Sequence, residues 1–270
     1  MASNDGYVHG YSEREAQRLR DQSASVRDLL HHDTRYPAGA IVLEAGCGVG
    51  AQTVTLARNS PDANIVSIDV NQASLDVARG AVAQAGLSNV TFQPADIFDL
   101  PFAPESFDHV FVCFVLEHLK QPSDGLSALA GVLREGGTIT VIEGDHGSCY
   151  FHPATEEAVR VWNCLIQVQM SLGADPLIGR RLYPLLNQAG FQNVEVTPRM
   201  VYADEGRPEL MESFVSKTIV PMVEGVQEQA IGSNLIDRAS WRQGIDDLKG
   251  IVQRGGGTFC YNFFKATGVR

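Results

Sequence analysis

The amino-acid sequence predicts an α/β protein built on a doubly wound, largely parallel sheet. Two observations carry this prediction. Five short apolar segments alternate with helical patterns between residues 40 and 143, and a glycine-rich turn follows the first of them. Short strands that alternate with helices form parallel β-α units, because the crossover between parallel strands is right-handed. After residue 145 longer helical stretches appear, which indicate a helical cap over the carboxyl ends of the strands.

The elements can be placed in order along the chain. Ser12 and Glu15 form a capping box that begins an amphipathic helix over residues 12–31. Strands are expected at 40–45, 64–69, 89–93, 107–114 and 138–143, with helices at 50–59, 72–86 and 123–135 between them. Later helices are expected at 154–173, 179–189, 208–230 and 238–253, and two last strands at 192–202 and 258–267, which need not be parallel to the others.

Composition excludes several classes of partner. The 270 residues carry 21 Lys and Arg against 32 Asp and Glu, a net charge of -11, so the field of the protein repels nucleic acid and anionic membranes. The N-terminus has no basic segment followed by an apolar one, and no apolar stretch reaches the ~18 residues of a membrane helix. We therefore expect a cytoplasmic protein that binds neither nucleic acid nor membrane.

Metal and disulfide chemistry are not indicated. The five cysteines are scattered and lack a C-x-x-C pair. The run His31-His32-Asp33 is too compact and too close to a helix end to suggest a metal site. We expect free thiols and no metal.

The glycine-rich turn Leu43–Gly50, LEAGCGVG, lies where the first strand meets the first helix. Glycines there let the backbone turn tightly and approach a ligand. Gly46, Gly48 and Ala51 also fit the dinucleotide pattern G-x-G-x-x-G/A, so the turn alone leaves the cofactor open. Glu44 favours S-adenosylmethionine over NAD, because a carboxylate there would repel a pyrophosphate but can pair with an amino-acid ammonium, directly or through water.

With four further stretches, this turn resembles the first motif of the class I S-adenosylmethionine-dependent methyltransferases, an acidic residue followed by G-x-G-x-G. The further stretches are Asp69 at the end of the second strand, ADIFDLPF around Asp96, Phe107-Asp108 with FVLEH at 114–118, and LREGGT at 133–138. The resemblance spans about residues 40–145. It implies a seven-stranded Rossmann-like methyltransferase sheet with helical cap insertions and S-adenosyl-L-methionine as cofactor, leaving S-adenosyl-L-homocysteine as product.

The resemblance also implies a domain organisation and a set of cofactor-binding residues. A helical lid would occupy residues 1–35, the S-adenosylmethionine-binding core 36–145, and a cap with the last two strands 146–270, all in a single domain. Asp69 would accept hydrogen bonds from the ribose hydroxyls and Asp96 from the adenine amino group, with apolar neighbours around the ring, Phe98 among them. The implied cofactor-binding residues are Tyr11, Arg18, Gln22, Glu44, Gly46, Gly48, Gly50, Asp69, Val70, Asp96, Ile97 and Phe114.

Catalysis needs few side chains, because methyl transfer from a sulfonium is an in-line displacement that depends on orientation in a water-poor pocket. A general base is required only if the acceptor binds protonated. The candidates are His118, after the fourth strand, and His146, beside Asp145 after the fifth. His118 can also be read as an ordinary residue at the start of a helix.

The sequence therefore predicts a methyltransferase that acts on a small, hydrophobic metabolite. Two alternatives stay open at this point. One is an NAD(P)-dependent oxidoreductase, and the other is a non-catalytic S-adenosylmethionine-binding protein. Apolar helices in the cap would also permit a homodimer.

Overall fold

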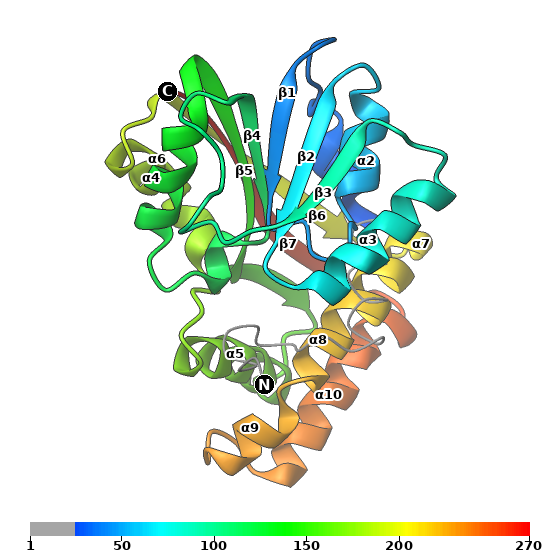
Figure 1. Ribbon diagram of the computed structural model, residues 1–270. Coiled ribbons are helices and arrows are strands. Elements are labelled where there is room, and N and C mark those ends of the chain that lie inside the picture. Colours follow the sequence, from blue (N-terminus) through cyan, green and yellow to red (C-terminus); the bar gives the residue numbers. More distant parts are fainter. Residues whose placement is uncertain (1–24) are drawn as a thin grey trace. The chain divides into compact units, whose positions relative to one another are not determined.

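The computed structural model describes residues 25–270, and its central feature is a mixed sheet (Figure 1). In this part of the chain seven strands form one sheet in the order β3-β2-β1-β4-β5-β7-β6. They are β1 Ile41–Ala45, β2 Asn64–Asp69, β3 Val90–Pro94, β4 Phe107–Cys113, β5 Leu133–His152, β6 Gln192–Ala203 and β7 Thr258–Val269. The predicted seven-stranded α/β fold is confirmed.

The first five strands pair in parallel, as the alternation of strands and helices predicts. β1 pairs with β2 and with β4, β2 pairs with β3, and β4 pairs with β5, all in parallel. Arg270, directly after β7, exchanges backbone hydrogen bonds with Gly136 and Gly137 near the start of β5. The end of β7 therefore lies beside the start of β5, so β7 runs antiparallel to it.

The chain divides into two compact units. Residues 27–144, 177–199 and 263–270 form one, which we call the core unit. The described residues of the other, which we call the cap unit, are 25–26, 145–176 and 200–262. This division differs from the expected three segments, because residues 177–199 and 263–270 fold with the core unit rather than with the cap.

Helices cover both faces of the sheet in the core unit. α2 (Thr53–Asn59) and α3 (Gln72–Gln84) lie on one face, and α4 (Pro122–Val132) and α6 (Leu182–Gln188) lie on the other (Figure 1). α3 begins at Asn71, whose side chain accepts a hydrogen bond from the Ser74 backbone N–H. Two single turns complete the unit, η1 (Leu116–His118) and η2 (Ile178–Arg181). The strands bury an apolar core that includes Leu43, Ile68, Val110, Val112, Ile139 and Val141.

A set of polar contacts fixes residues 31–34, where the helical residues 25–31 end. The buried His31 ring is hydrogen-bonded to Gln52 at 2.8 Å. Lys265 Nζ donates to Asp33 and Thr34 at 2.6 and 2.7 Å, and Arg199 also donates to Asp33. The compact His31-His32-Asp33 run therefore links this segment to α2, β6 and β7.

The fifth strand is much longer than predicted. We expected a strand at 138–143, but β5 extends from Leu133 to His152. The segment GDHGSCYFH, expected to follow the strand, is part of it. The glycines and polar residues in this segment are typical of a loop, and only pairing with neighbouring strands, which the sequence does not show, makes it a strand.

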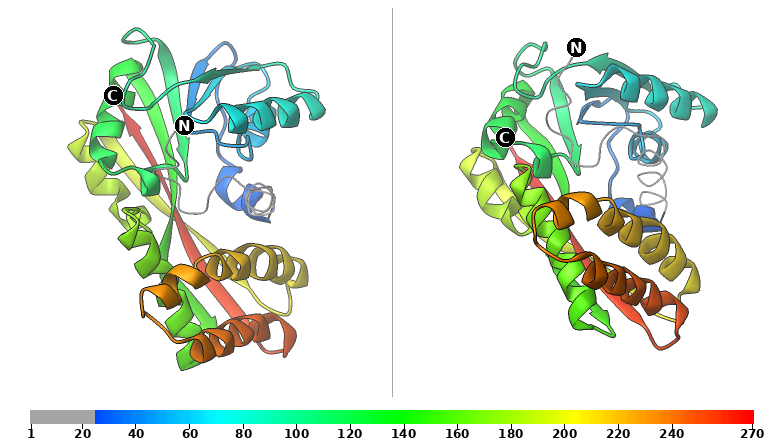
Figure 2. Two further views of the ribbon diagram at one scale, coloured as in Figure 1. Left: turned by 60° about the horizontal axis from the view of Figure 1, so that its bottom comes forward. Right: turned by 90° about the horizontal axis from the view of Figure 1, so that it is seen from below.

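The cap unit is helical, and its longest predicted helix is interrupted. α5 (Glu156–Ser171) and α10 (Arg238–Gln253) pack against each other, and Figure 2 shows them side by side in green and orange. The single helix predicted over 208–230 is instead α7 (Pro208–Leu210), a π-helical segment η3 (Met211–Ile219), α8 (Val220–Glu224) and α9 (Gln227–Gly232). Pro221, which lacks a backbone N–H, and Gly225, at the end of α8, explain why a regular helix does not continue.

Gly244 sets how closely α5 and α10 approach in the cap unit. A Cβ atom there would lie 2.4 Å from the Glu157 carbonyl oxygen and 2.6 Å from a Val161 methyl. We expect Gly244→Ala to lower the free energy of unfolding by about 1–3 kcal/mol, measured by urea denaturation. Gly232→Ala is the matched control, because a Cβ there meets nothing within 4 Å, and it should be near neutral. Equal effects of the two substitutions would contradict the close approach.

Candidate functional site

The strand order of the core unit predicts a ligand-binding crevice at the carboxyl ends of its first four strands. The chain order reverses between β1 and β4, so the loops that follow these two strands lead to opposite sides of the sheet. In open α/β sheets ligands bind at such a switch point, outside the carboxyl ends of the strands. Four segments follow these ends: the glycine loop after β1, Asp69-Val70 after β2, Asp96–Phe98 after β3 and Phe114–His118 after β4.

The glycine loop is shaped by positions whose backbone conformation favours glycine. Gly46, Gly48 and Gly50 have φ of 77°, 51° and 77°, in the left-handed region. A Cβ at Gly46 would lie 2.6 Å from a methyl of Val115, and one at Gly50 would lie 2.9 Å from Ala78. At Gly48 a Cβ would meet nothing within 4 Å among residues 25–270.

Asp69 is tied to the glycine loop by its own carboxylate. Oδ2 accepts a hydrogen bond from the Gly48 N–H at 2.8 Å, and Oδ1 accepts one from Asn71 N–H at 2.9 Å. Burial raises the pKa of Asp69, although these backbone N–H groups oppose the shift. The structure thus brings the two sequence-predicted elements, the loop and the acid after β2, into direct contact.

Apolar side chains are exposed beside these acids. Val70 is 66% exposed and Phe98 is 47% exposed, unusually high for large hydrophobic residues, whereas Ile97 is buried. Asp96 is exposed, and its Oδ1 accepts a hydrogen bond from the Phe98 N–H at 2.9 Å. An exposed carboxylate between exposed apolar groups suits a flat, polar-edged ring such as adenine.

Glu44 is buried behind the loop rather than exposed to the crevice. It is 2% exposed, and its Oε2 accepts hydrogen bonds from the Thr53 and Ser67 hydroxyls at 2.8 and 2.5 Å. Burial raises the pKa of Glu44 to about 7, although both hydroxyls oppose the shift. The carboxyl therefore connects β1, β2 and α2 beneath the loop.

The two candidate bases lie in different surroundings. His118 is in η1, directly after β4 as expected, with Nε2 3.4 Å from Glu117 Oε1 and 17% of its side chain exposed. His146 was expected after the fifth strand, and this position is wrong, because β5 continues through it. His146 is buried, and its Nδ1 shares a hydrogen bond of 2.7 Å with the Tyr261 hydroxyl.

The turn after β4 contains the predicted residue Phe114 and is held by a residue of β5, Glu143, that the sequence analysis missed. Phe114 has φ of 59°, rare for a residue other than glycine, and its ring lies 5.5 Å from that of Phe263. Glu143 of β5 accepts hydrogen bonds from the next two backbone N–H groups, those of Val115 and Leu116. A glutamate ending an apolar strand is the one signal in the sequence, and it does not show that the partners are backbone groups.

Three of the predicted cofactor-binding residues, Tyr11, Arg18 and Gln22, lie outside the described residues.

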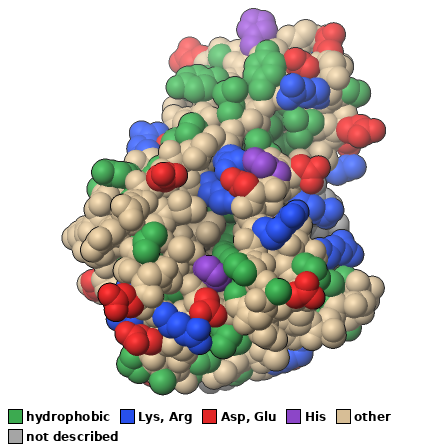
Figure 3. Space-filling view, turned by 90° about the horizontal axis from the view of Figure 1, so that it is seen from above, with side chains coloured by type: hydrophobic (Ala, Val, Ile, Leu, Met, Phe, Trp, Pro, Cys, Tyr) green, Lys and Arg blue, Asp and Glu red, His purple; other side chains and the backbone are tan. Residues whose placement is uncertain are grey.

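The described residues also bear on metal binding, membrane insertion and surface charge. Within residues 25–270, no group of three or more His, Cys, Asp or Glu side chains could hold a metal ion, and no helix is long and apolar enough to span a bilayer. Figure 3 shows acidic and basic side chains interspersed over one face.

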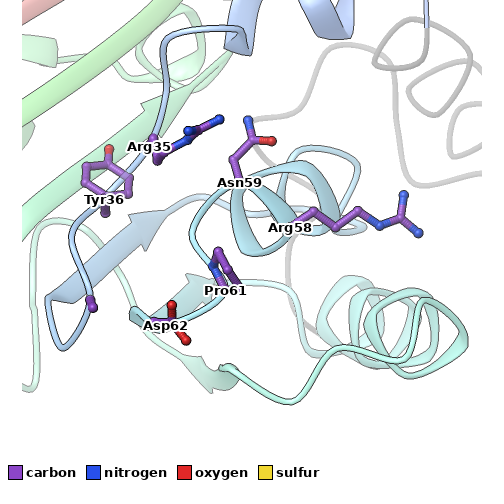
Figure 4. Close-up of a pocket in the computed structure, with 7 residues that line it drawn as sticks. Arg35, Tyr36, Arg58, Asn59, Pro61 and Asp62 are labelled. Atoms are coloured by element: carbon purple, nitrogen blue, oxygen red, sulfur yellow. The ribbon is translucent and has the colours of Figure 1, made fainter.

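A surface hollow of about 430 Å³ lies away from the crevice (Figure 4). Its residues precede β1, end α2 or connect α2 to β2, so they lie near the amino ends of these strands, opposite the glycine loop. They are Arg35, Tyr36, Ala38, Arg58, Asn59, Pro61 and Asp62. The hollow is therefore separate from the predicted cofactor site.

Comparison with known proteins agrees with the site geometry. A family model described as a methyltransferase domain matches residues 43–141. An O-methyltransferase of Penicillium expansum is 32% identical over 71% of this chain and 67% of its own length. An O-methyltransferase of Aspergillus sclerotiorum is 31% identical over 71% of each chain. Matches to other relatives are shorter, covering 24% of one and 45% of another.

The chain belongs to the class I S-adenosylmethionine-dependent methyltransferases. Membership carries the family's cofactor, S-adenosylmethionine, and its reaction, methyl transfer. It agrees with the motifs in the sequence and with the acid-and-glycine geometry of the crevice.

Solved structures share the fold. A crystal structure of a protein from Bacillus halodurans, described as a putative methyltransferase, has a TM-score of 0.57 at 16% identity and covers 91% of this chain and 98% of its own. The [4+2]-cyclase SpnF has a TM-score of 0.55 at 18% identity and covers 100% of this chain and 88% of its own. At such identities these likenesses establish the fold alone.

The buried Glu44 carboxyl should make stability depend on pH. With its pKa raised from 4.5 to about 7, the folded protein keeps a proton that the unfolded chain releases, so stability falls as pH rises through this window. The loss is up to about 3 kcal/mol. Glu44→Gln should remove it, so the free energy of unfolding of the variant relative to the parent should increase from pH 4.5 to pH 8. A difference that stays constant over this range would contradict the assignment.

Proposed function

We propose that the protein transfers the methyl group of S-adenosylmethionine to a small, uncharged or cationic acceptor of hydrophobic character. One observation carries the proposal. The segments at the carboxyl ends of the first four strands, residues 44–53, 67–71, 95–99 and 113–118, contain four acidic residues besides the buried Glu44 and no Lys or Arg. Such a crevice favours a cofactor with a sulfonium and an ammonium over one with a pyrophosphate. It therefore supports S-adenosylmethionine rather than NAD.

The chain's own residues would hold the cofactor along the crevice. Gly46, Gly48 and Gly50 allow the backbone to approach it, and Asp69 would accept hydrogen bonds from the ribose hydroxyls. Asp96 would accept from the adenine amino group, with Val70, Ile97 and Phe98 around the ring. Glu44 would act on the ammonium through water, since its own carboxyl is buried, and Phe114 would border the reacting end. The bound cofactor supplies an activated methyl group.

A base is needed if the acceptor is a hydroxyl that binds protonated. We favour His118 for this role, because η1 directly follows β4 at the crevice and 17% of the His118 side chain is exposed. His146 is the second candidate. It is buried and hydrogen-bonded to Tyr261, so a catalytic role would require proton transfer through that hydroxyl.

Other properties follow from composition. We propose that the protein has no nucleic-acid partner, on the support of the net charge of -11, and the cytoplasmic location stays a prediction. A homodimer stays a prediction, which the mass of the particle in solution would test.

Calorimetric titration should detect S-adenosylhomocysteine binding with micromolar affinity and no binding of NAD or NADP. Asp69→Ala should weaken this binding by about 2 kcal/mol, roughly 30-fold, because charge-assisted hydrogen bonds are lost. Asp62→Ala is the matched control: it removes the same charge at the opposite end of β2 and should leave binding unchanged. Binding of a nicotinamide nucleotide instead would overturn the proposed cofactor.

The catalytic roles of His118 and His146 can be tested once an acceptor is known. Screening small hydrophobic compounds by mass spectrometry for the added mass of a methyl group would identify one. His118→Ala should lower kcat by about 10²-fold or more with unchanged affinity for S-adenosylhomocysteine, as expected for a general base. His146→Ala should mainly lower the free energy of unfolding, since it breaks a buried hydrogen bond. A larger loss of kcat in His146→Ala than in His118→Ala would reverse the assignment.

A further inference from the structure

The turn that follows β4 adopts a conformation that needs support. Phe114, with φ of 59°, lies in the left-handed region that disfavours side chains. Its backbone N–H donates to the Ile142 carbonyl of β5 at 2.9 Å. Such a conformation persists only when surrounding contacts fix it, and the contacts here come from β5.

Glu143 provides the main support from β5. A single oxygen, Oε1, accepts hydrogen bonds from the Val115 N–H at 2.9 Å and the Leu116 N–H at 2.7 Å. The side chain is fully buried, and burial raises its pKa well above the usual range, with the nearby Glu117 carboxylate adding to the shift. Without this acceptor two backbone donors of the turn would lack a partner.

The turn that Glu143 supports also sets the position of the glycine loop. The Val115 methyl groups occupy the space beside Gly46, where a Cβ would lie only 2.6 Å from one of them. The loop and the turn are therefore packed together with no free space, and a shift of Val115 displaces or loosens the loop. The same turn continues into Glu117 and His118 of η1.

Glu143 also has an oxygen that the turn does not use. Its Oε2 is buried and meets no hydrogen-bond partner among residues 25–270. A buried carboxyl oxygen without a partner costs free energy, so the need to fill space would not favour a glutamate over an apolar residue of similar volume. The single bifurcated acceptor is therefore the feature of Glu143 that the surrounding structure uses.

We propose that Glu143 is a positioning residue for the cofactor site: through one carboxyl oxygen it fixes the turn Phe114–Leu116, and through Val115 it fixes the glycine loop. The inference rests on the proposed function, because it assumes that the glycine loop binds S-adenosylmethionine. It adds a residue from β5 that touches neither cofactor nor acceptor but determines the geometry of the loop that does.

The test measures S-adenosylhomocysteine affinity by calorimetry in Glu143→Ala and Glu143→Gln. Glu143→Ala should raise the Kd at least 10-fold, because the turn loses its acceptor. Glu143→Gln keeps a carbonyl oxygen at the same place and should restore the Kd to within 3-fold of the parent. Ile65→Ala is the control, a buried residue near the amino end of β2 whose loss destabilises the core unit without touching the turn.

The outcomes separate the two claims. If the parent protein does not bind S-adenosylhomocysteine, the proposed function fails. If the parent binds and Glu143→Ala binds within 3-fold, or Ile65→Ala weakens binding as much as Glu143→Ala, the positioning role is overturned. It is also overturned if Glu143→Gln fails to restore binding.

A second variant decides the matter if Glu143→Ala does not fold. Val115→Ala keeps both backbone hydrogen bonds to Glu143 but removes the methyl groups that pack on Gly46. It should raise the Kd for S-adenosylhomocysteine at least 3-fold while circular dichroism and urea denaturation show a folded protein. Unchanged affinity in Val115→Ala would overturn the link between turn and loop.

Discussion

The contact between Gly46 and Val115 is the constraint on which the site depends. It joins the loop after β1 to the turn after β4, the two strands between which the chain order reverses. Because a side chain at Gly46 has no room, the loop and the turn have one way to pack. Asp69 then holds the other side of the loop through the Gly48 N–H. The crevice is thus bounded by groups whose positions determine one another.

Buried titratable groups around the loop act on stability in opposite directions. Burial lowers the pKa of His31 to about 4, so the stability it contributes is lost as pH falls from 6.5 towards 4. Glu44, with its pKa raised to about 7, lowers stability as pH rises over an overlapping range. Between about pH 4.5 and 6.5 the two slopes oppose each other. The pH dependence that Glu44 gives to the free energy of unfolding is therefore offset, over this range, by the pH dependence that His31 gives to it.

The sequence predicted the parts of the fold that depend on local pattern. β1 to β4 were placed within about one residue, because apolar runs bounded by turn residues carry their own signal. β5 beyond Glu143 and the interruption of 208–230 were missed, because both depend on partners distant in sequence. The same division holds in the site. Asp69 and the glycine loop, found from their spacing, are in contact, whereas Glu143 binds backbone groups that no residue pattern reveals.

A fold shared with a cyclase shows that the sheet alone does not decide the reaction. The charges beside the crevice bear on which reaction the site favours. A fixed negative charge near the sulfonium would stabilise the bound cofactor more than the transition state, because the positive charge disappears as the methyl group leaves. Such a charge would therefore slow methyl transfer. Glu143, beneath the turn after β4, is buried, and burial raises the pKa of its carboxyl well above the usual range, which disfavours a negative charge there. Asp69 and Asp96 lie instead after β2 and β3, at the positions proposed for the ribose and adenine. The acids proposed to bind the cofactor thus act at its ribose and adenine, whereas Glu117, after β4, lies beside the proposed base His118.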